Sequence, residues 1–257
     1  MKKQIISLFA LLLSFSMSSP AQKTYALVMG IQKYDNPSFH QNPLKNTAKD
    51  ARDVKKVLSK SGCEVSLLTG KYVNKENVNY KLSQMVSLVN NRPNKDNIII
   101  FFSGHGGDGI MCMWDGKYSY MELFNRLRNA KARNIFIFLD ACLSGSCGQI
   151  MTQMSDINPR ISVISATRPD ETSIDDPFQV IVHGWYSQGL IKGLRGMGDK
   201  NEDRKITLME LYRYLYNDVT SRSNHYEDIS MGMISSFHPQ LYGPISMHES
   251  VVVEWKK

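Results

Sequence analysis

The sequence predicts an α/β fold with a mainly parallel central sheet of about six strands, flanked by helices on both faces. Two runs of five large apolar residues, 98–102 and 135–139, are typical of strands that are covered on both faces. Helical patterns separate the expected strands, and this alternation favours parallel βαβ units. A length of 257 residues with 42% hydrophobic residues suits one large domain with its own core.

Hydrophobic periodicity predicts the elements in order. The first helix is the clearest case, because apolar residues recur at helical spacing at Ala48, Ala51, Val54, Val57 and Leu58. The expected strands are 24–31, 64–68, 98–102, 135–139, 161–165 and 251–255. The expected helices are 46–60, 76–91, 119–130, 181–194 and 208–217, with a hairpin around 110–114.

The first residues have the pattern of a secretory signal. Lys2 and Lys3 precede an apolar segment that ends in small residues at Ala21. The segment is too short for a comfortable transmembrane helix, and no cysteine follows it closely, as one would in a lipoprotein. We therefore expect cleavage after Ala21 and a single domain over residues 22–257. The mature protein is expected to be exported, either periplasmic or secreted, and free of the membrane.

The mature chain is mildly basic. The whole sequence has a formal net charge of +7, and residues 1–21 contain two lysines and no acid, which leaves 7 − 2 = +5. Lysines and arginines are scattered among acids, and no basic run is interleaved with aromatic residues, so nucleic-acid binding is not indicated. We expect a charged, solvated surface and a monomer.

Two of the apolar runs stop at residues with catalytic chemistry. One is followed by Ser103, His105 and Gly106, and the other by Asp140 and Cys142. Because parallel strands end at the same edge of a sheet, His105 and Cys142 are expected side by side. A nearby imidazolium favours the reactive thiolate, and the same imidazole can protonate a leaving amine. The pair therefore predicts a cysteine nucleophile with its acid/base partner, although either residue alone is more often structural.

Glycine beside the histidine has a use of its own. With no side chain, Gly106 lets its amide approach a substrate carbonyl. The amides of Gly106 and Cys142 are therefore the expected oxyanion hole.

The other cysteines do not indicate a disulfide scaffold. A nucleophilic Cys142 has to stay free, which leaves Cys63, Cys112 and Cys147, an odd set without scaffold-like spacing. No pair of cysteines or histidines has the spacing of a structural zinc site.

With Ser-Gly-His-Gly at 103–106 and Asp-Ala-Cys-Leu-Ser-Gly at 140–145, the sequence resembles the caspase and metacaspase superfamily of cysteine peptidases. Bacterial metacaspase-like members are more similar than animal caspases, because Asp140 stands where animal caspases have glutamine. The segments 25–34, 44–51, 183–196 and 198–215 extend the resemblance over nearly the whole mature chain. It implies a caspase-like fold and an endopeptidase that forms an acyl-enzyme with the dyad His105 and Cys142. It also implies a peptide or protein substrate. Many metacaspase-like enzymes need calcium, and for this chain we expect no required cofactor.

The resemblance further implies which residues bind the substrate side chain. Positions that match Asp50, Ser103 and Asp140 line the S1 pocket of metacaspases. Two carboxylates suit a guanidinium or ammonium group, and no arginine adjoins either motif, as it would in aspartate-specific caspases. Arginine or lysine at P1 is therefore expected. Without the resemblance, acids at such positions are usually caps or loop ion pairs.

A later loop resembles a calcium-binding EF-hand. Oxygen ligands stand at positions 1, 3, 5, 7 and 12 of the loop, supplied by Asp199, Asn201, Asp203, the Lys205 carbonyl and Glu210. Position 6, which needs glycine, is Arg204. The alternative is an Asp-rich turn into a helix capped by Thr207, and we favour it slightly. A second acidic cluster that could serve calcium is Asp170, Glu171, Asp175 and Asp176.

Residues 143–159 stand where caspases carry a linker that is cleaved on activation. They contain no lysine or arginine, so an enzyme specific for basic residues could not cut itself there before Arg160. The segment is short and polar, and we expect a loop over the active site.

Two alternatives stay open. One is another peptidase of the same clan, clostripain-like or legumain-like, against which the C-terminal half argues. The other is a catalytically inactive binding module with the same fold, against which the intact His105, Gly106 and Cys142 argue. Labelling of Cys142 by a peptidyl chloromethyl ketone with a basic P1 residue would separate enzyme from module.

Overall fold

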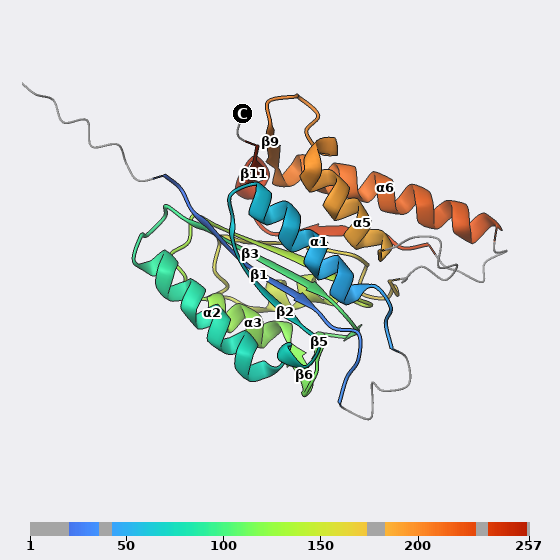
Figure 1. Ribbon diagram of the computed structural model, residues 1–257, viewed down its shortest axis with the longest axis horizontal. Helices are drawn as coiled ribbons and strands as arrows, with labels where there is room; N and C mark the ends of the chain where they lie inside the picture. The colour runs from blue at the N-terminus through green and yellow to red at the C-terminus, as the bar shows by residue number, and fades with distance from the viewer. Residues whose placement is uncertain (1–20, 36–42, 174–182, 230–235, 256–257) are drawn as a thin grey trace, which may run out of the picture.

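The fold is built on one sheet with the strand order β10-β8-β7-β3-β1-β2 (Figure 1). The computed structural model describes residues 21–35, 43–173, 183–229 and 236–255. The strands are β1 (Thr24–Gly30), β2 (Glu64–Thr69), β3 (Asn97–Ser103), β7 (Asn134–Asp140), β8 (Ile161–Ser165) and β10 (Gln240–Tyr242). Every neighbouring pair is parallel except β10 with β8. The predicted α/β class and mainly parallel six-stranded sheet are confirmed.

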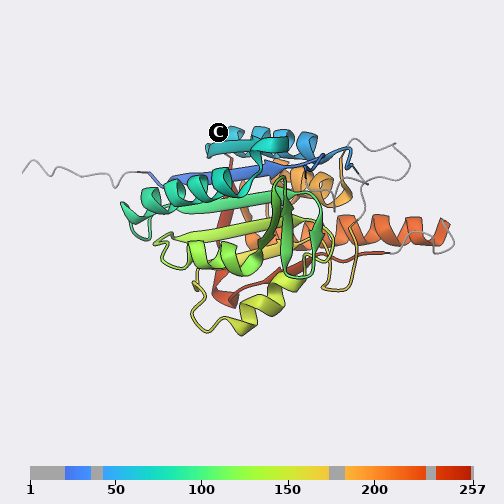
Figure 2. The ribbon, with the colours of Figure 1, turned by 90° about the horizontal axis from the view of Figure 1, so that it is seen from below.

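Helices cover both faces of this sheet (Figures 1 and 2). One face carries α1 (Thr47–Lys60), α5 (Trp185–Lys192) and α6 (Leu208–Ile229), and the other α2 (Lys75–Asn90), α3 (Tyr120–Leu127) and α4 (Ser146–Gln153). Along β3, Ile99 and Phe101 are buried on the face of α1, α5 and α6. Ile98, Ile100 and Phe102 are buried on the face of α2, α3 and α4. Because both faces are covered, β3 and β7 are apolar between their first and last residues.

Short strands and turns complete the description. A three-stranded hairpin sheet follows β3 and consists of β4 (Gly106–Gly107), β5 (Ile110–Met113) and β6 (Gly116–Ser119), which confirms and extends the predicted hairpin. The expected last strand is present as β11 (Val251–Glu254), which pairs with β9 (Lys205–Thr207) outside the main sheet. The helical turns are η2 (Gly70–Tyr72), η3 (Gly193–Met197) and η4 (Ile245–Met247).

One expectation about the elements was wrong, and two expected helices are present with other bounds. Residues 143–159 contain helix α4 in place of a loop. Tertiary packing stabilises this helix, since Cys147 is fully buried and Gly148 packs closely on Tyr242 of β10. The helix expected at 181–194 begins only at Trp185 and passes into the π-helical turn η3, and residues 181–182 lie outside the described residues. The helix expected at 208–217 continues to Ile229 as α6.

Gly30 fixes the distance between β1 and α1. A side-chain carbon at this position would lie 2.2 Å from the Thr47 carbonyl oxygen and 2.7 Å from Ala51 Cβ. The first turn of α1 therefore packs directly on the end of β1, as only glycine allows. This contact brings Thr47 and Asp50 to the carboxyl edge of the sheet.

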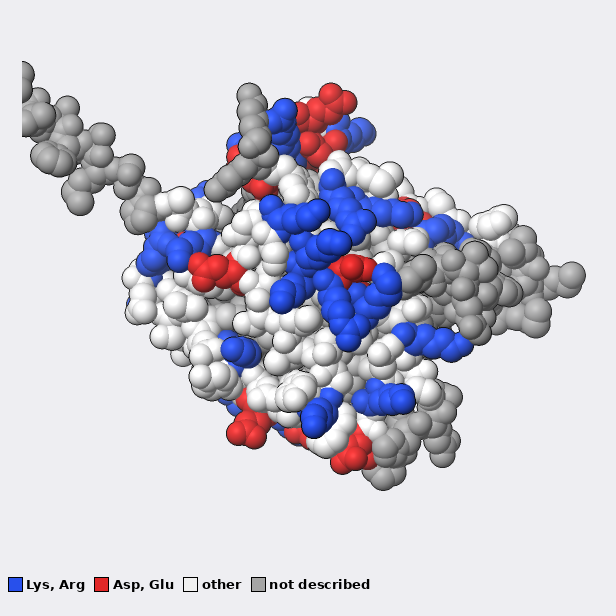
Figure 3. Space-filling model, in the orientation of Figure 1, with Lys and Arg blue, Asp and Glu red and all other residues white. Residues whose placement is uncertain are grey.

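The outer face of α1 is basic (Figure 3). Arg52, Lys55, Lys56 and Lys60 are exposed, because spacings of three and four residues share one side of a helix. The linear sequence suggested a mixed surface, but Asp50, one of the two acids of this helix, is buried. Among the described residues, none of the helices combines the length and the hydropathy needed to cross a membrane.

Candidate active site

The two motif-bearing strands end at the same point of the sheet. Ser103 of β3 lies opposite Asp140 of β7, and the Gly104 amide donates to the Asp140 carbonyl at 3.2 Å. His105 and Cys142 each follow two residues after this pair, and both are half-buried. The structure therefore brings the predicted nucleophile and its predicted partner to one edge.

Gly106 lies directly against the cysteine. A side-chain carbon at Gly106 would lie 2.5 Å from the Cys142 carbonyl oxygen and 2.8 Å from Ala141 Cβ. Any other residue would push the His105 loop away from the loop of Cys142. The two residues named for the oxyanion hole are thus in contact through their backbones.

Tyr34 holds the histidine in place, a role that sequence reasoning missed. Its ring stacks on the His105 imidazole with centroids 5.1 Å apart. The His105 amide donates to the Tyr34 hydroxyl at 2.6 Å, and that hydroxyl donates to the Ile31 carbonyl at 3.4 Å. Burial raises the pKa of Tyr34 far above its usual range, so the hydroxyl stays neutral and can serve both bonds.

The loop after Cys142 is tied down by its neighbours. Leu143 has φ = 54°, a left-handed conformation that is strained for a leucine. Its amide donates to the Glu171 carbonyl at 2.9 Å, and the Ser144 amide donates to Thr167 Oγ1 at 3.0 Å. These bonds stabilise a sharp turn that presents Cys142 at the strand end.

The surroundings of Cys142 favour the thiol over the thiolate. The thiol donates to the Ser173 carbonyl at 3.5 Å. Burial is the main cause that raises its pKa, and the negative charge of Asp140 acts in the same direction. All four cysteines are free, and burial raises the pKa of Cys112 to about 11. Since a thiolate is the reactive form, the site needs a base or a compensating positive charge.

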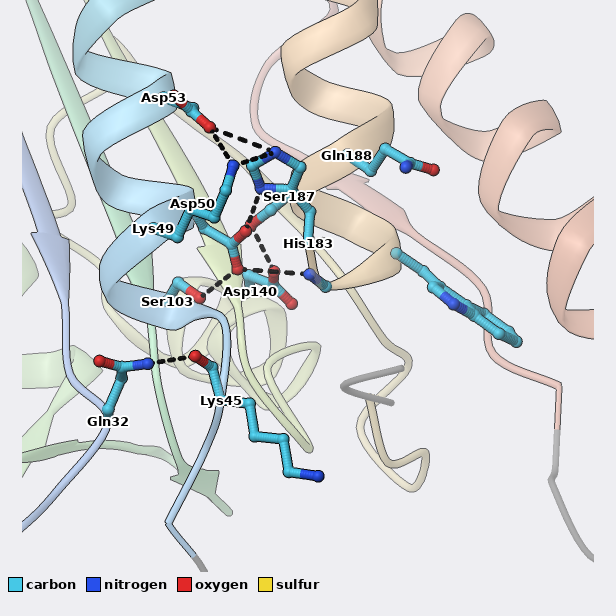
Figure 4. A network of polar contacts seen from close by, with 12 residues as sticks. Gln32, Lys45, Lys49, Asp50, Asp53, Ser103, Asp140, His183, Ser187 and Gln188 are labelled. Carbon is cyan, nitrogen blue, oxygen red and sulfur yellow. Dashed lines mark hydrogen bonds and ion pairs between the residues drawn. The ribbon is translucent and has the colours of Figure 1, made fainter. Parts of the chain in front are cut away.

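Asp50, Ser103 and Asp140 line one small cavity (Figure 4). We call it the acidic cavity; its other lining residues are Leu44, Thr47, Ser173 and Gly184. Its volume is about 30 Å³, room for about one or two water molecules. Asp50 and Asp140 are 1% and 7% exposed, so both carboxylates are buried in its wall. The three residues named for the S1 pocket are therefore brought together.

Hydroxyl groups and a histidine surround these carboxylates. Asp140 accepts from Ser187 at 2.5 Å and from Ser173 at 3.2 Å. Asp50 Oδ1 lies 2.6 Å from His183 Nδ1. Thr47 also faces the acidic cavity, and no hydrogen-bond partner for its buried hydroxyl lies among the described residues. Helical spacing from Asp50 could have found Thr47, whereas His183 lies 133 residues from its partner and gave no local signal.

The EF-hand-like loop uses its oxygens locally. Arg204 takes the left-handed φ of 67° that position 6 requires, so the missing glycine does not prevent the turn. Asp199 Oδ2 accepts from the Arg204 amide at 2.8 Å, and Asp203 Oδ1 accepts from the Lys205 amide at 2.8 Å. Glu210 and Thr207 cap the start of α6 reciprocally, since Glu210 Oε2 accepts from the Thr207 amide and Thr207 Oγ1 from the Glu210 amide.

The protein itself engages only part of the oxygens of this loop. Asp199 Oδ1 is buried, and none of the described residues forms a hydrogen bond with it, so this oxygen is available to a cation. Glu210, however, is engaged as a cap, and the described part of the chain contains no group of three His, Cys, Asp or Glu side chains that could hold a metal. In the second acidic cluster, Glu171 pairs with His238 at 2.7 Å, while Asp175 and Asp176 lie outside the described residues.

A larger cavity at the opposite edge of the sheet lacks the chemistry of the motif site. Its volume is about 410 Å³, and its lining includes Cys63, Asn97, Asn134 and residues of β11. It contains a thiol but no histidine, so it offers no nucleophile with an adjacent imidazole.

Comparison with known families agrees with the resemblance that the motifs of the site suggested. The family profile described as "Caspase domain" matches residues 23–242. The chain belongs to the caspase domain family. Residues 23–242 thus form a caspase domain of a peptidase family.

Individual relatives are distant. A vacuolar-processing enzyme of Phaseolus vulgaris is 26% identical over 173 residues, which is 62% of this chain and 32% of the relative, so the chain spans about a third of its length. Caspase-1 of Spodoptera frugiperda superposes with a TM-score of 0.67 at 17% identity over 92% of this chain and 91% of that one. A protein of Geobacter sulfurreducens superposes with a TM-score of 0.64 at 17% identity over 91% and 100%. These structures show the caspase-like fold, and the metacaspase-like subtype stays a prediction.

Tyr34 offers a test of how His105 is positioned. Tyr34→Phe keeps the stacked ring and removes the hydroxyl that binds the His105 amide, so we expect peptidase kcat to fall about tenfold and stability by about 1 kcal/mol. Tyr118→Phe is the matched control, because its hydroxyl makes a comparable bond at 2.7 Å to Asn79. It should lower the melting temperature similarly and leave kcat unchanged. Equal kcat for both variants would contradict the role of Tyr34.

Proposed function

We propose that this caspase-family protein is an exported endopeptidase that cleaves after arginine or lysine with the dyad His105 and Cys142. The leader-like sequence of residues 1–21 supports export to the periplasm or the medium. The contact of the two motif loops at one sheet edge supports the dyad.

One observation carries the preference for a basic residue. The acidic cavity places the carboxylates of Asp50 and Asp140 in one wall, and no lysine or arginine stands among those of its lining residues that the structure describes. Two carboxylates buried in one wall carry a desolvation cost and repel each other, and a bound guanidinium or ammonium group would offset both effects. The Thr47 hydroxyl supplies a further acceptor in the same cavity. An acidic P1 residue would instead be repelled.

The acidic cavity has to widen to take such a side chain. A volume of about 30 Å³ is far smaller than an arginine side chain. Substrate binding therefore moves the wall residues apart. Ser173 and Gly184 of this wall stand on either side of residues 174–182, which lie outside the described residues.

The chemistry follows from the dyad. His105 accepts the thiol proton, and the Cys142 sulfur attacks the scissile carbonyl carbon. The amides of Gly106 and Cys142 donate to the resulting oxyanion. His105 then protonates the leaving amine, and an acyl-enzyme forms. Water, deprotonated by His105, releases the carboxylic acid and restores the thiol.

Substitution of the dyad tests the enzyme assignment. Cys142→Ala and His105→Ala should each lower kcat/KM by about a thousandfold or more, and the double variant should be little worse, because the dyad acts as a unit. A peptidyl chloromethyl ketone with P1 arginine should label Cys142 and spare Cys63, the other half-buried thiol. Substantial turnover by Cys142→Ala would rule out the assignment, and absence of labelling would favour a binding module.

Asp140→Asn separates binding from thiol reactivity. The loss of a buried charge should raise KM and lower kcat/KM for Arg and Lys substrates by about 10- to 100-fold. Because Asp140 raises the pKa of Cys142, the variant should at the same time react faster with uncharged iodoacetamide at neutral pH. Asp156→Asn, an exposed acid paired with Arg128, is the control and should change neither rate.

A substrate library that varies the P1 residue tests the proposed specificity. Preference for aspartate or asparagine at P1 would contradict the basic-P1 assignment and favour the caspase or legumain comparison.

Calcium dependence is the last prediction for this site. Because Glu210 is engaged as a helix cap, we expect equal activity on a basic-P1 substrate in chelator and in millimolar calcium. Calcium activation that disappears in the double variant Asp199→Ala, Asp203→Ala would place the ion in this loop. Activation that survives that variant would place it elsewhere.

A further inference from the structure

Exposed cations gather on the outer side of α1 and on the turn η3 that packs against it (Figure 3). We call this surface the basic face; its residues are Arg52, Lys55, Lys56, Lys60 and Arg195. Among the described residues, no acid forms an ion pair with any of these side chains. The basic face therefore presents its positive charges to solvent and to whatever binds there.

The acid that borders the basic face is already paired within the protein. Asp53 Oδ2 lies 2.6 Å from Lys49 Nζ. Burial alone would raise the pKa of Asp53, but the hydrogen bond and charge of Lys49 hold that pKa below its usual range. Arg195 acts in the same direction, which places its guanidinium group near this carboxylate. Asp53 is thus ionised and mainly compensated by Lys49, and the basic face keeps its net positive charge.

The basic face and the acidic cavity share one helix. The first turn of α1 supplies Thr47 and Asp50 to the cavity (Figure 4). At 1.5 Å per residue, Arg52 lies about 3 Å and Lys60 about 15 Å along the helix axis from Asp50. An extended polypeptide covers about 3.3 Å per residue, so about five to eight residues lead from the acidic cavity around α1 to the basic face. One bound peptide can therefore reach both surfaces.

The composition of the basic face indicates the kind of partner that it fits. The space between its side chains on α1 has a volume of about 440 Å³ and is lined by Arg52, Lys55, Lys56, Ser59 and Lys60. Aromatic and large apolar side chains are absent from this described lining. It therefore offers neither the apolar core of a stable protein interface nor a stacking surface for nucleotide bases.

A flexible acidic polypeptide segment needs neither of these features. Its carboxylates can accept charge-assisted hydrogen bonds from lysine and arginine without a fixed shape on either side. Because the chain belongs to a peptidase family, such a segment can reach the basic face as part of the substrate itself.

We propose that the basic face is an exosite that binds an acidic segment of the substrate, about five to eight residues from the scissile bond. The inference rests on the proposed function, because the same substrate places a basic P1 residue in the acidic cavity. The two oppositely charged surfaces then select substrates that carry a basic residue at P1 and acids at a distance from it. Attraction between exposed charges raises the rate of association, and salt weakens it.

Peptides of equal length with arginine at P1 test the exosite. An uncharged spacer of about six residues separates the scissile bond from a run of glutamates, glutamines or lysines. The run stands on the N-terminal side in one set and on the C-terminal side in the other. In one of the two sets, kcat/KM at about 50 mM salt should be about tenfold higher for the glutamate peptide than for the glutamine peptide, mainly through KM. The lysine peptide should be the poorest substrate, and at about 500 mM salt the differences should fall below about twofold.

A quadruple variant removes the basic face of α1. Glutamine suits an exposed helix, so Arg52→Gln, Lys55→Gln, Lys56→Gln, Lys60→Gln should fold, and it should cleave the glutamate and glutamine peptides equally well. The matched control removes the same charge from exposed positions outside α1, with Lys71→Gln, Lys95→Gln, Lys117→Gln, Lys131→Gln. The control should keep the preference for the glutamate peptide. Circular dichroism checks the folding of both variants.

A binding measurement separates the exosite from the proposed function. In Cys142→Ala protein, fluorescence anisotropy should show binding of a labelled peptide that has the glutamate run and no arginine, and the quadruple substitution should weaken this binding about tenfold. Loss of all cleavage after arginine, with this binding preserved, would overturn the proposed function and leave the acid-binding face standing.

Other outcomes overturn the exosite itself. Equal kcat/KM for the glutamate and glutamine peptides in both sets, with cleavage after arginine intact, would remove the exosite and leave the basic P1 preference standing. Binding to phosphatidylglycerol vesicles that the quadruple variant loses, without any discrimination among the peptides, would assign the basic face to a bilayer instead.

Discussion

The in-register pairing of β3 with β7 is the constraint on which the site depends. Because Ser103 lies opposite Asp140, the residues after both strands start from the same level of the sheet edge. A shift of one residue would turn one of the two side chains to the opposite face of the sheet. The packing of Gly106 on Cys142 completes the arrangement, since it allows the two loops to touch. Two short loops, one after β3 and one after β7, are therefore enough to bring His105 and Cys142 to the same edge.

Under the proposed function, Asp140 contributes both to substrate selection and to the reactivity of the nucleophile. Its carboxylate lines the acidic cavity, and its charge adds to burial in raising the pKa of Cys142. A cation bound in the acidic cavity compensates this charge and removes that part of the penalty on the thiolate. Under the proposed function, a basic P1 side chain thus favours the reactive form of the thiol at the moment of binding.

The parts that sequence could predict are those fixed by local patterns. The continuous apolar runs located β3 and β7 to within a residue at each end, because strands covered on both faces have an unambiguous pattern. Helix α4 escaped prediction because its sequence is short and rich in weak helix formers, and packing around Gly148 stabilises it. The contacts of Tyr34 with His105 and of His183 with Asp50 join residues 71 and 133 positions apart, which no local pattern reveals.

The two faces of α1 separate charges that the linear sequence mixes. Asp50 faces the acidic cavity, while Arg52, Lys55 and Lys56 face solvent on the outer side. The attraction for a cation is therefore confined to the acidic cavity, where two buried carboxylates act at short range and little screened. Outside the acidic cavity, the exposed lysines of α1 oppose this attraction, and salt screens their effect beyond a Debye length of about 8 Å. Under the proposed function, such a field selects one basic side chain at the P1 position and gives no general attraction for basic proteins.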